Sequence, residues 1–194
     1  MRLWSLLDRL TQRVVPLGRR LAGFARHFVN RAAPEDPQRE ATIDRLFKQF
    51  VEAIEAAYFA ADSPVKPIAG VLEYFDRLRA AGIKVALDTG YPRQIADHLI
   101  ARMGFAGHID GSLVSEEVGH GRPYPYMIHG LMRQLKVAKV QAVAKAGDTA
   151  LDMEEGRNAG CQIVIGVLSG ADNAATLLKH GASAVVPSVV DYPI

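Results

Sequence analysis

The chain has 194 residues, enough to bury the core of one domain with a small appendage. Hydrophobic residues make up 49% and charged residues 23%, and no apolar run approaches the roughly 18 residues of a membrane span, so we expect a soluble globular protein without stable membrane insertion. The formal net charge of +2 indicates no nucleic-acid partner. The single cysteine, Cys161, excludes an internal disulfide and fits a reducing, cytoplasmic compartment.

The first 34 residues form a basic head. They contain seven arginines against Asp8 alone, a net charge of +6, so the remaining residues carry −4 of the total of +2. Apolar residues recur between the arginines at roughly helical spacing until Pro16. Such a segment is typical of an interfacial or organelle-targeting helix. The alternative, favoured by few serines and no clear cleavage signal, is a solvated helix packed on the body.

Helices and short apolar strands alternate along the rest of the chain. A polar, proline-containing loop at residues 32–39 precedes a strong helical stripe from Ala41 to Ala61, and a second helix is expected over residues 69–81, ending at Gly82. The pattern then predicts strands at residues 83–87, 112–114, 140–146, 162–168 and 184–186, separated by helices at residues 92–103, 126–135, 151–159 and 174–180. Strands without polar alternation predict an α/β fold with a doubly wound parallel sheet covered on both faces.

Ligands in such sheets bind beyond the carboxyl ends of the strands, so the residues that follow each strand are informative. The first strand is followed by Asp88, Thr89 and Gly90, just before a helix. A hydroxyl group and a glycine backbone N–H at that position suit an anion. A Thr-Gly turn that opens a helix is also a common structural feature, so this signal is weak alone.

Two further segments carry candidate chemistry. Arg122 lies in a loop of glycines and prolines, GHGRPYP, which would hold its planar guanidinium ready for phosphate or carboxylate, although such an arginine is often without function. The strand at residues 140–146 is followed by Asp148 and, four residues later, Asp152. Two convergent carboxylates suit Mg²⁺; alternatively, Asp148 or Thr149 simply caps the following helix.

Together and in this order, these segments are more specific than any one of them. The words DTGYPR, GRPYPYM, AGDTALDMEEGRNAG and IVIGVLSGA resemble the haloacid dehalogenase superfamily, and most closely its phosphonatase-like branch. The resemblance covers roughly residues 68–194 and implies a Rossmannoid hydrolase core with a partial helical cap. It further implies Mg²⁺-dependent hydrolysis of a small phosphorylated or phosphonated metabolite.

The resemblance also assigns roles to individual residues. Thr89 would bind the transferring phosphoryl group together with Gly90, and Arg122 would steady that group where most of the superfamily has lysine. Asp148 would ligate Mg²⁺, and Asp152 would order the water shell of the metal. Thr89, Arg122 and Asp152 are therefore the candidate catalytic residues, and Asp148 and Asp152 are the candidate metal site.

The chain departs from the family at its start. Members attack with the first aspartate of an Asp-x-Asp-Gly-Thr motif after an N-terminal strand, and no such motif occurs here. Residues 13–17, RVVPL, are the only strand-like candidate for this N-terminal strand, and the proline within them argues against a central strand. Lys48 is expected to face solvent rather than to form the Schiff base of a phosphonatase.

Other polar and aromatic side chains give weaker signals. His98, His108 and His120 match no metal-ligand spacing, and of these only His120 lies near the arginine loop. Tyr124 and Tyr126 are expected to be packing residues.

These observations predict three segments: a head at residues 1–34, a cap remnant at residues 35–66 and a core at residues 67–194. The expected function is a phosphohydrolase with impaired activity, because the nucleophile motif is missing. The alternative is a non-catalytic phosphate- or metal-binding or interaction protein built on the same core, and a homodimer stays open.

Overall fold

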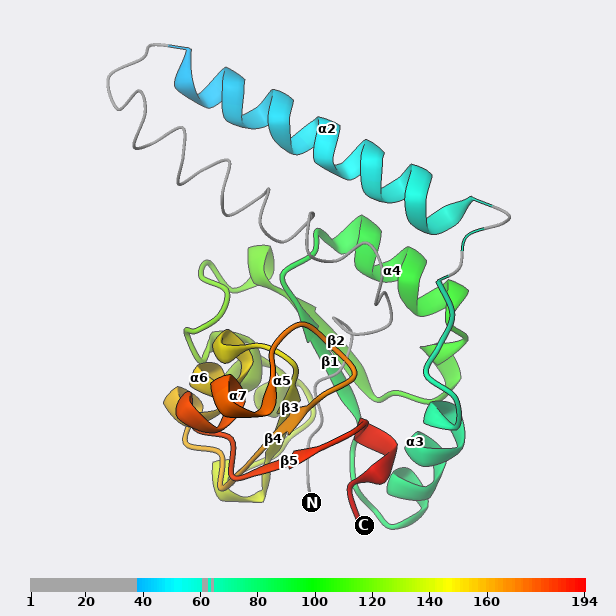
Figure 1. Cartoon of the computed structure of the whole chain (residues 1–194), viewed down its shortest axis with the longest axis vertical. Coiled ribbons are helices and arrows are strands. Elements are labelled where there is room, and N and C mark those ends of the chain that lie inside the picture. Colours follow the sequence, from blue (N-terminus) through cyan, green and yellow to red (C-terminus); the bar gives the residue numbers. More distant parts are fainter. Residues whose placement is uncertain (1–37, 61–62, 64) are drawn as a thin grey trace. The chain divides into compact units, whose positions relative to one another are not determined.

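The computed structural model describes residues 38–60, 63 and 65–194 (Figure 1). The basic head at residues 1–34 and the RVVPL segment lie outside these residues. Among the described residues, 66–194 form one compact unit, and those before residue 66 belong to another. The two units are therefore considered separately.

Helix α2, Arg39–Phe59, is the helix predicted from the apolar stripe. Ile54 and Tyr58 are buried, as that stripe requires, and the Lys48 side chain is 79% exposed and lies 4.0 Å from Glu52. The prediction that Lys48 faces solvent is confirmed. None of the described helices combines the length and the apolar character needed to cross a membrane.

The core unit alternates strands and helices as predicted. Its strands are β1 (Ala86–Thr89), β2 (Gly111–Val114), β3 (Ala144–Gly147), β4 (Ile163–Val167) and β5 (Ala184–Val186). Its α-helices are α3 (Val71–Ala80), α4 (Arg93–Arg102), α5 (Tyr126–Gln134), α6 (Ala150–Ala159) and α7 (Ala174–Lys179), with short 3₁₀ turns at Phe105–Gly107, Ser115–Glu117, Val140–Ala142 and Val189–Asp191.

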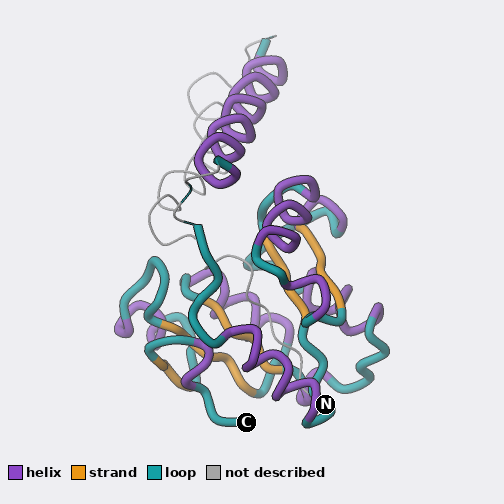
Figure 2. Tube along the Cα trace, turned by 90° about the vertical axis from the view of Figure 1, so that its right-hand side faces the viewer, coloured by secondary structure: helices purple, strands orange, loops and turns teal. Residues whose placement is uncertain are grey.

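All described strand pairs are parallel, which confirms the α/β class. β1 pairs with β2, Ala86 opposite Gly111, and β3, β4 and β5 form a second ladder in that order. The two groups of strands are visible in Figure 2. Within the described residues no ladder joins β1 to β3, so the predicted single sheet is seen as a two-stranded and a three-stranded part.

Two strand boundaries differ from the prediction. The first strand begins at Ala86 rather than at residue 83 and runs on through Asp88 and Thr89, because its pairing is set by β2. Residues 140–142 form a 3₁₀ turn instead of the start of a strand, and β3 begins at Ala144. Apolar residues predict strand in both places, but a ladder starts only where the neighbouring strand supplies hydrogen-bonding partners.

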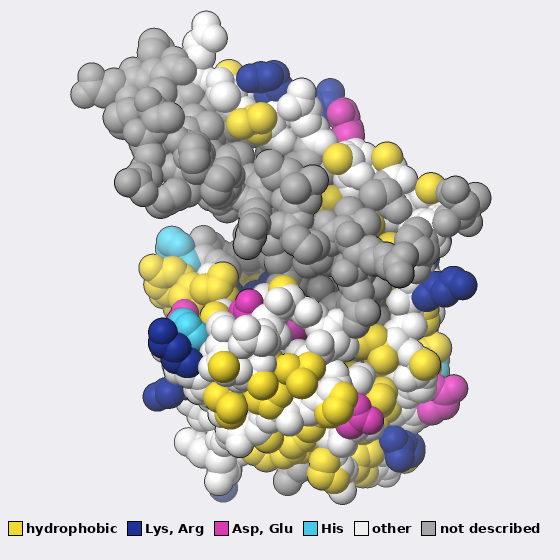
Figure 3. Space-filling view, in the orientation of Figure 1, with side chains coloured by type: hydrophobic (Ala, Val, Ile, Leu, Met, Phe, Trp, Pro, Cys, Tyr) yellow, Lys and Arg dark blue, Asp and Glu magenta, His cyan; other side chains and the backbone are white. Residues whose placement is uncertain are grey.

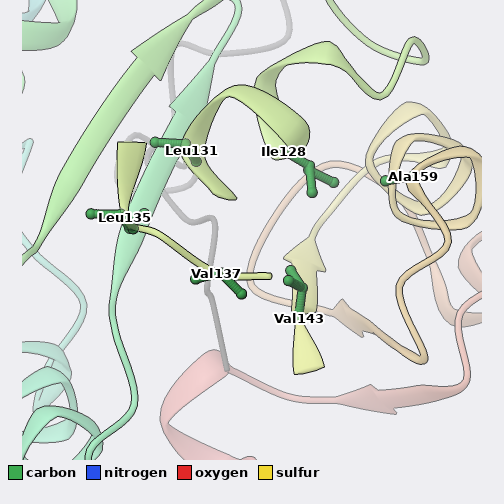
Figure 4. Packing of buried hydrophobic residues seen from close by; sticks show 7 residues of the cluster. Ile128, Leu131, Leu135, Val137, Val143 and Ala159 are labelled. Atoms are coloured by element: carbon green, nitrogen blue, oxygen red, sulfur yellow. The ribbon is translucent and has the colours of Figure 1, made fainter. Parts of the chain in front are cut away.

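The core is made of apolar side chains between the strands and helices. One cluster joins α5 to β3 and α6 and contains Ile128, Leu131, Val143 and Ala159 (Figure 4). A second cluster, built from Met153, Val164 and Leu177, packs α6 and α7 on β4. Each fully buried side chain of this size contributes about 1.5–3 kcal/mol, so these contacts hold the helices that carry the candidate site against the strands.

Candidate functional site

The candidate site lies where β1 and β3 end. Asp88 and Thr89 are the last residues of β1, both 1% exposed, and the Thr89 hydroxyl oxygen accepts the N–H of Tyr91 at 3.1 Å. This hydrogen bond turns the backbone sharply through Gly90 toward the start of α4. Thr89 and Gly90 are thus presented at the carboxyl edge of the strands, where the sequence predicted them.

Arg122 reaches this edge from the loop between β2 and α5. Its side chain is only 9% exposed, and its Nη1 donates a hydrogen bond to Oδ1 of Asp152 in α6. A Cβ added to Gly90 would lie 3.5 Å from Nη2, so the guanidinium lies beside the Gly90 backbone. The predicted anion-binding residues Thr89, Gly90 and Arg122 are therefore neighbours.

The loop around Arg122 is fixed to the core at further points. The side-chain amide of Asn158 in α6 donates to the carbonyl of Pro123 at 2.9 Å. Gly121 lies so close to the end of β2 that an added Cβ would be 2.8 Å from Cβ of Ser115. Arg122 therefore starts from a held backbone, which lowers the entropy cost of binding an anion.

Asp152 lies in the first turn of helix α6 and takes part in capping that helix. Thr149 is the N-cap, its hydroxyl accepting the Asp152 N–H, and Oδ2 of Asp152 accepts the Thr149 N–H at 3.1 Å. This reciprocal capping satisfies two helix-end donors. Gly147 permits it, because a Cβ there would lie 2.0 Å from Cβ of Asp152. The capping alternative for Thr149 is thus realised, with Asp152 as its partner.

Asp148 has different partners from Asp152. It is 2% exposed, and its Oδ2 accepts the N–H of Ala171 at 2.9 Å, while its carbonyl oxygen accepts the N–H of Asp172 at 3.0 Å. Gly170 is required beside it, because a Cβ there would lie 2.0 Å from Oδ2. Asp148 is therefore held by the loop after β4, whereas Asp152 is held by Arg122 and Thr149.

A buried charge cluster lies beneath the site. Nζ of Lys145, in β3, is 2.7 Å from Oδ1 of Asp88, 2.6 Å from Oε2 of Glu155 and 3.4 Å from Oδ1 of Asp152. The side chains of Lys145, Asp88 and Glu155 are fully buried. The cluster thus joins β1, β3 and α6 through polar side chains that have no access to water.

Burial and neighbours set the charges in this cluster. Burial, reinforced by the nearby Asp88 carboxylate, raises the pKa of Glu155 to about 8, so Glu155 is mainly protonated at neutral pH. Burial alone would lower the pKa of Lys145, but the carboxylates of Asp88, Glu155 and Asp152 together raise it above its ordinary value. Lys145 is therefore a permanent ammonium.

The donor set indicates where a metal would fit. Carboxylate oxygens of Asp88, Asp152 and Glu155 lie within 4.8 Å of one another, an arrangement that suits a cation. The ammonium of Lys145 lies among these oxygens, so it supplies the positive charge there. Asp148 lies outside this trio and offers one buried carboxylate just after the end of β3.

Sequence reasoning missed the roles of Lys145, Glu155 and Asp88. A lysine between alanines in a buried strand is a signal, because a fully buried lysine needs a counter-charge. Glu155 follows Asp152 by three residues and therefore lies on the same helix face. The opposite charge on β1 was not recognisable from local spacing, since Asp88 is 57 residues away from Lys145.

The expectation that Tyr124 and Tyr126 are packing residues is wrong. Tyr124 is 51% exposed and Tyr126 43% exposed, and both rings lie beside the ring of His120. The aromatic side chains that follow Arg122 are therefore partly exposed on the surface of the loop. Burial raises the pKa of the Cys161 thiol to about 12, which disfavours its reactive thiolate form at neutral pH.

Comparisons with known proteins bear on this arrangement. The model of the family described as haloacid dehalogenase-like hydrolase matches residues 5–160, a range that includes most of the basic head. A phosphonoacetaldehyde hydrolase of Bacillus cytotoxicus is 36% identical over 142 residues, 73% of this chain and 52% of the relative. A phosphonoacetaldehyde hydrolase of Bacillus cereus is 37% identical over 133 residues, 68% and 49% of the two chains. The chain thus spans about half the length of these curated relatives.

Solved structures resemble the whole chain. A β-phosphoglucomutase of Clostridium difficile superposes with a TM-score of 0.73 at 14% identity, over 100% of this chain and 93% of the other. A phosphonoacetaldehyde hydrolase-like protein of Oleispira antarctica gives 0.63 at 21% identity, over 97% and 88%. At these identities the likeness concerns the fold alone.

Proposed function

Because the chain belongs to the haloacid dehalogenase-like hydrolases, we propose that it binds the phosphoryl group of a small phosphorylated or phosphonated metabolite at Thr89, Gly90 and Arg122. The observation that carries the proposal is the placement of Arg122, whose buried guanidinium lies between the Gly90 backbone and Asp152. A held guanidinium beside a strand-end hydroxyl and a helix start is a well-formed environment for a phosphoryl dianion.

We place Mg²⁺ at Asp148, with Asp152 ordering the water around it. Asp148 offers a buried carboxylate at the end of β3, and Asp152 is already engaged by Arg122 and Thr149, which suits an indirect role. A bound Mg²⁺ would neutralise negative charge on the phosphoryl group. Arg122 would also neutralise charge on the group and would keep it oriented.

The proposed chemistry is hydrolysis of the ester or phosphonate at low rate or not at all. The sequence contains no Asp-x-Asp-Gly-Thr motif, and loss of a catalytic nucleophile reduces turnover by on the order of 10⁶. Electrostatic stabilisation by Arg122 and Mg²⁺ remains valuable but does not replace the attacking group.

The same missing motif favours a second candidate, a non-catalytic protein that binds phosphate in the same pocket. Both candidates require the anion pocket and differ only in turnover. Phosphate release from a panel of small phosphoesters and phosphonoacetaldehyde, with and without Mg²⁺, separates them.

For the hydrolase, we expect slow, Mg²⁺-dependent release that Asp148→Asn abolishes, and for the binder we expect a phosphate-dependent rise of the melting temperature without release. Turnover near the ~10 s⁻¹ typical of enzymes would contradict the impaired activity. Failure of inorganic phosphate to bind would contradict both candidates.

A further inference from the structure

Arg93 is the first residue of α4 and connects this helix to the segment that leads to Arg122. Its guanidinium forms a two-point ion pair with Glu117, in which Nε donates to Oε1 at 3.0 Å and Nη2 donates to Oε2. The backbone N–H of Arg93 also donates to Oε1 of Glu116 at 2.9 Å. The turn between β1 and α4 is thus joined to the 3₁₀ turn after β2 through both a side chain and the backbone.

The other donors of the Arg93 guanidinium are also used within the protein. Nη1 donates to the Ser112 hydroxyl at 3.0 Å and to Oδ1 of Asp97 at 3.1 Å, and Nη2 makes a longer contact of 3.5 Å to the Ser112 carbonyl. Together with the two bonds to Glu117, these contacts match the N–H groups that a guanidinium offers. Arg93 is therefore suited to hold other groups in place rather than to bind an anion itself.

Glu117 is held as firmly as Arg93. Its Oε2 accepts the N–H of Val114, the last residue of β2, at 2.9 Å. Burial would raise the pKa of Glu117, but the hydrogen bonds from Arg93 and from Val114 lower it below its ordinary value, so the carboxylate is ionised at neutral pH. The ion pair is therefore charged on both sides and attached to the carboxyl end of β2.

Both sides of this ion pair lead to the proposed phosphate pocket. On one side, Gly90 lies in the turn just before α4. On the other side, the 3₁₀ turn is packed against the arginine loop, because a Cβ on Gly121 would lie 2.8 Å from Cβ of Ser115. The two sides meet where Nη2 of Arg122 would lie 3.5 Å from a Cβ on Gly90. The ion pair thus closes a ring of contacts that contains Gly90 and Arg122.

Ion pairs at a protein surface are common and contribute little stability one by one. Figure 3 shows basic and acidic side chains interspersed with hydrophobic ones on the visible face of the core unit. The position of a pair therefore matters more than its presence.

The pair of Arg79 and Asp110, 3.5 Å apart, offers a comparison. Asp110 directly precedes β2, and its Oδ2 accepts the Val85 N–H at 2.8 Å, directly before β1. This pair therefore lies at the amino ends of β1 and β2, whereas Arg93 and Glu117 lie at their carboxyl ends, where the proposed pocket is.

We propose that Arg93 and Glu117 are positioning residues for phosphate binding: their ion pair keeps Gly90 and Arg122 close enough to contact one phosphoryl group, and neither residue contacts that group. This inference rests on the proposed function and adds two residues to it. Two groups that are held together before a ligand arrives bind it at a smaller entropy cost than two groups that must be ordered on binding.

Calorimetry of inorganic phosphate binding to the full-length protein tests the proposal through Glu117→Gln. Removal of a negative charge near the pocket would by itself favour an anion, whereas loss of the two-point ion pair should weaken phosphate binding about three- to tenfold. The sign of the change thus distinguishes positioning from simple electrostatic attraction. Arg93→Lys, which keeps the charge without the planar fork, should lose less affinity than Arg93→Ala.

Asp110→Asn and Arg79→Ala are the matched controls, because they remove the same charges from the pair at the amino ends of the same strands. Their dissociation constants for phosphate should stay within about twofold of the parent value. Thermal melting without phosphate shows whether each variant is folded at the temperature of the titration.

Unchanged or tighter phosphate binding by folded Glu117→Gln would overturn the inference and leave the proposed function in place. Equal losses of affinity in Glu117→Gln and Asp110→Asn would assign the effect to a general loosening of the fold and would also overturn it. If Glu117→Gln does not fold, Arg93→Lys decides, since parent-like affinity in that variant would exclude a role for the two-point pair. Failure of the parent protein to bind phosphate would remove the proposed function and the inference together.

Discussion

Arg122 is the residue on which the proposed phosphate pocket depends. Its guanidinium is nearly buried and lies beside Gly90, with Asp152 as its partner. Asp152 therefore partly neutralises the guanidinium and holds it in one orientation, so that we expect a phosphate dianion to bind without reordering this side chain.

Replacing Arg122 by alanine or by lysine should distinguish the contribution of its positive charge to phosphate binding from that of its planar shape. We expect inorganic phosphate to raise the melting temperature of the parent protein and not that of Arg122→Ala, because stabilisation by a ligand requires binding to the native state. Arg122→Lys should keep a smaller response, since an ammonium supplies charge without the planar fork. The measurement is a thermal melt over a phosphate series, with the exposed Arg133→Ala as control. An undiminished response in Arg122→Ala would show that phosphate binds elsewhere.

The raised pKa of Glu155 predicts a specific dependence of the unfolding free energy on pH. Its pKa is about 8 in the folded protein against an ordinary value of 4.5. Between these values the folded state retains a proton that the unfolded state has released, so stability falls as pH rises from about 4.5 to about 8. Glu155→Gln, which is neutral at every pH, should flatten this part of the curve. Urea unfolding at several pH values tests it, and an equal slope in both proteins would contradict the raised pKa.

At the scale of elements, the decisive contact is between α6 and β3. Gly156 lies where the helix passes over the strand, and a Cβ there would be 2.9 Å from Cβ of Lys145 and 3.0 Å from Cγ2 of Val164. Close packing thus explains Gly147 and Gly156 of the AGDTALDMEEGRNAG segment, and it brings Asp152 and Glu155 close to β3.

Gly156→Ala should destabilise the protein in spite of the better helix propensity of alanine. Overpacking of a rigid contact costs typically ~1–3 kcal/mol, and helix propensity returns up to ~1 kcal/mol. Gly107→Ala is the matched control, because no atom lies within 4 Å of a Cβ at Gly107. Equilibrium unfolding in urea compares the two variants. Equal free energies of unfolding would mean that α6 shifts to accommodate the added methyl group without loss of stability.

At the scale of the whole core unit, a buried ion pair links two strands that share no ladder of hydrogen bonds. Within the described residues β1 and β3 belong to different ladders, yet Lys145 of β3 pairs with Asp88 of β1. A buried ion pair of this kind contributes little net stability relative to apolar residues, but loss of one partner leaves the other charge buried.

We therefore expect Lys145→Met to lose about 3–5 kcal/mol of unfolding free energy. The double variant Lys145→Met with Asp88→Asn should regain much of that loss, because no isolated charge remains. A double-mutant cycle by urea unfolding measures the recovery. Additive losses would show that the pair does not couple the strands.

The sequence by itself determined the helices, the succession of strands along the chain and the motifs of the site. Helical periodicity and glycine-rich strand ends are local properties, so α2, α4 and α5 agree with prediction to within two residues at each end. The family was recognisable for the same reason, because its motifs are short and contiguous. Domain limits and the roles of Thr89, Arg122, Asp148 and Asp152 remain predictions.

Only the tertiary structure decided which side chains meet. Arg122 and Asp152 are 30 residues apart, and Asp88 and Lys145 are 57 apart, so neither pair has a local signal. Strand ends at β1 and β3 depended on their partners, and the exposure of Tyr124 and Tyr126 depended on the path of one loop. Burial and charge pairing arise from contacts between distant segments, and periodicity along the chain does not encode those contacts.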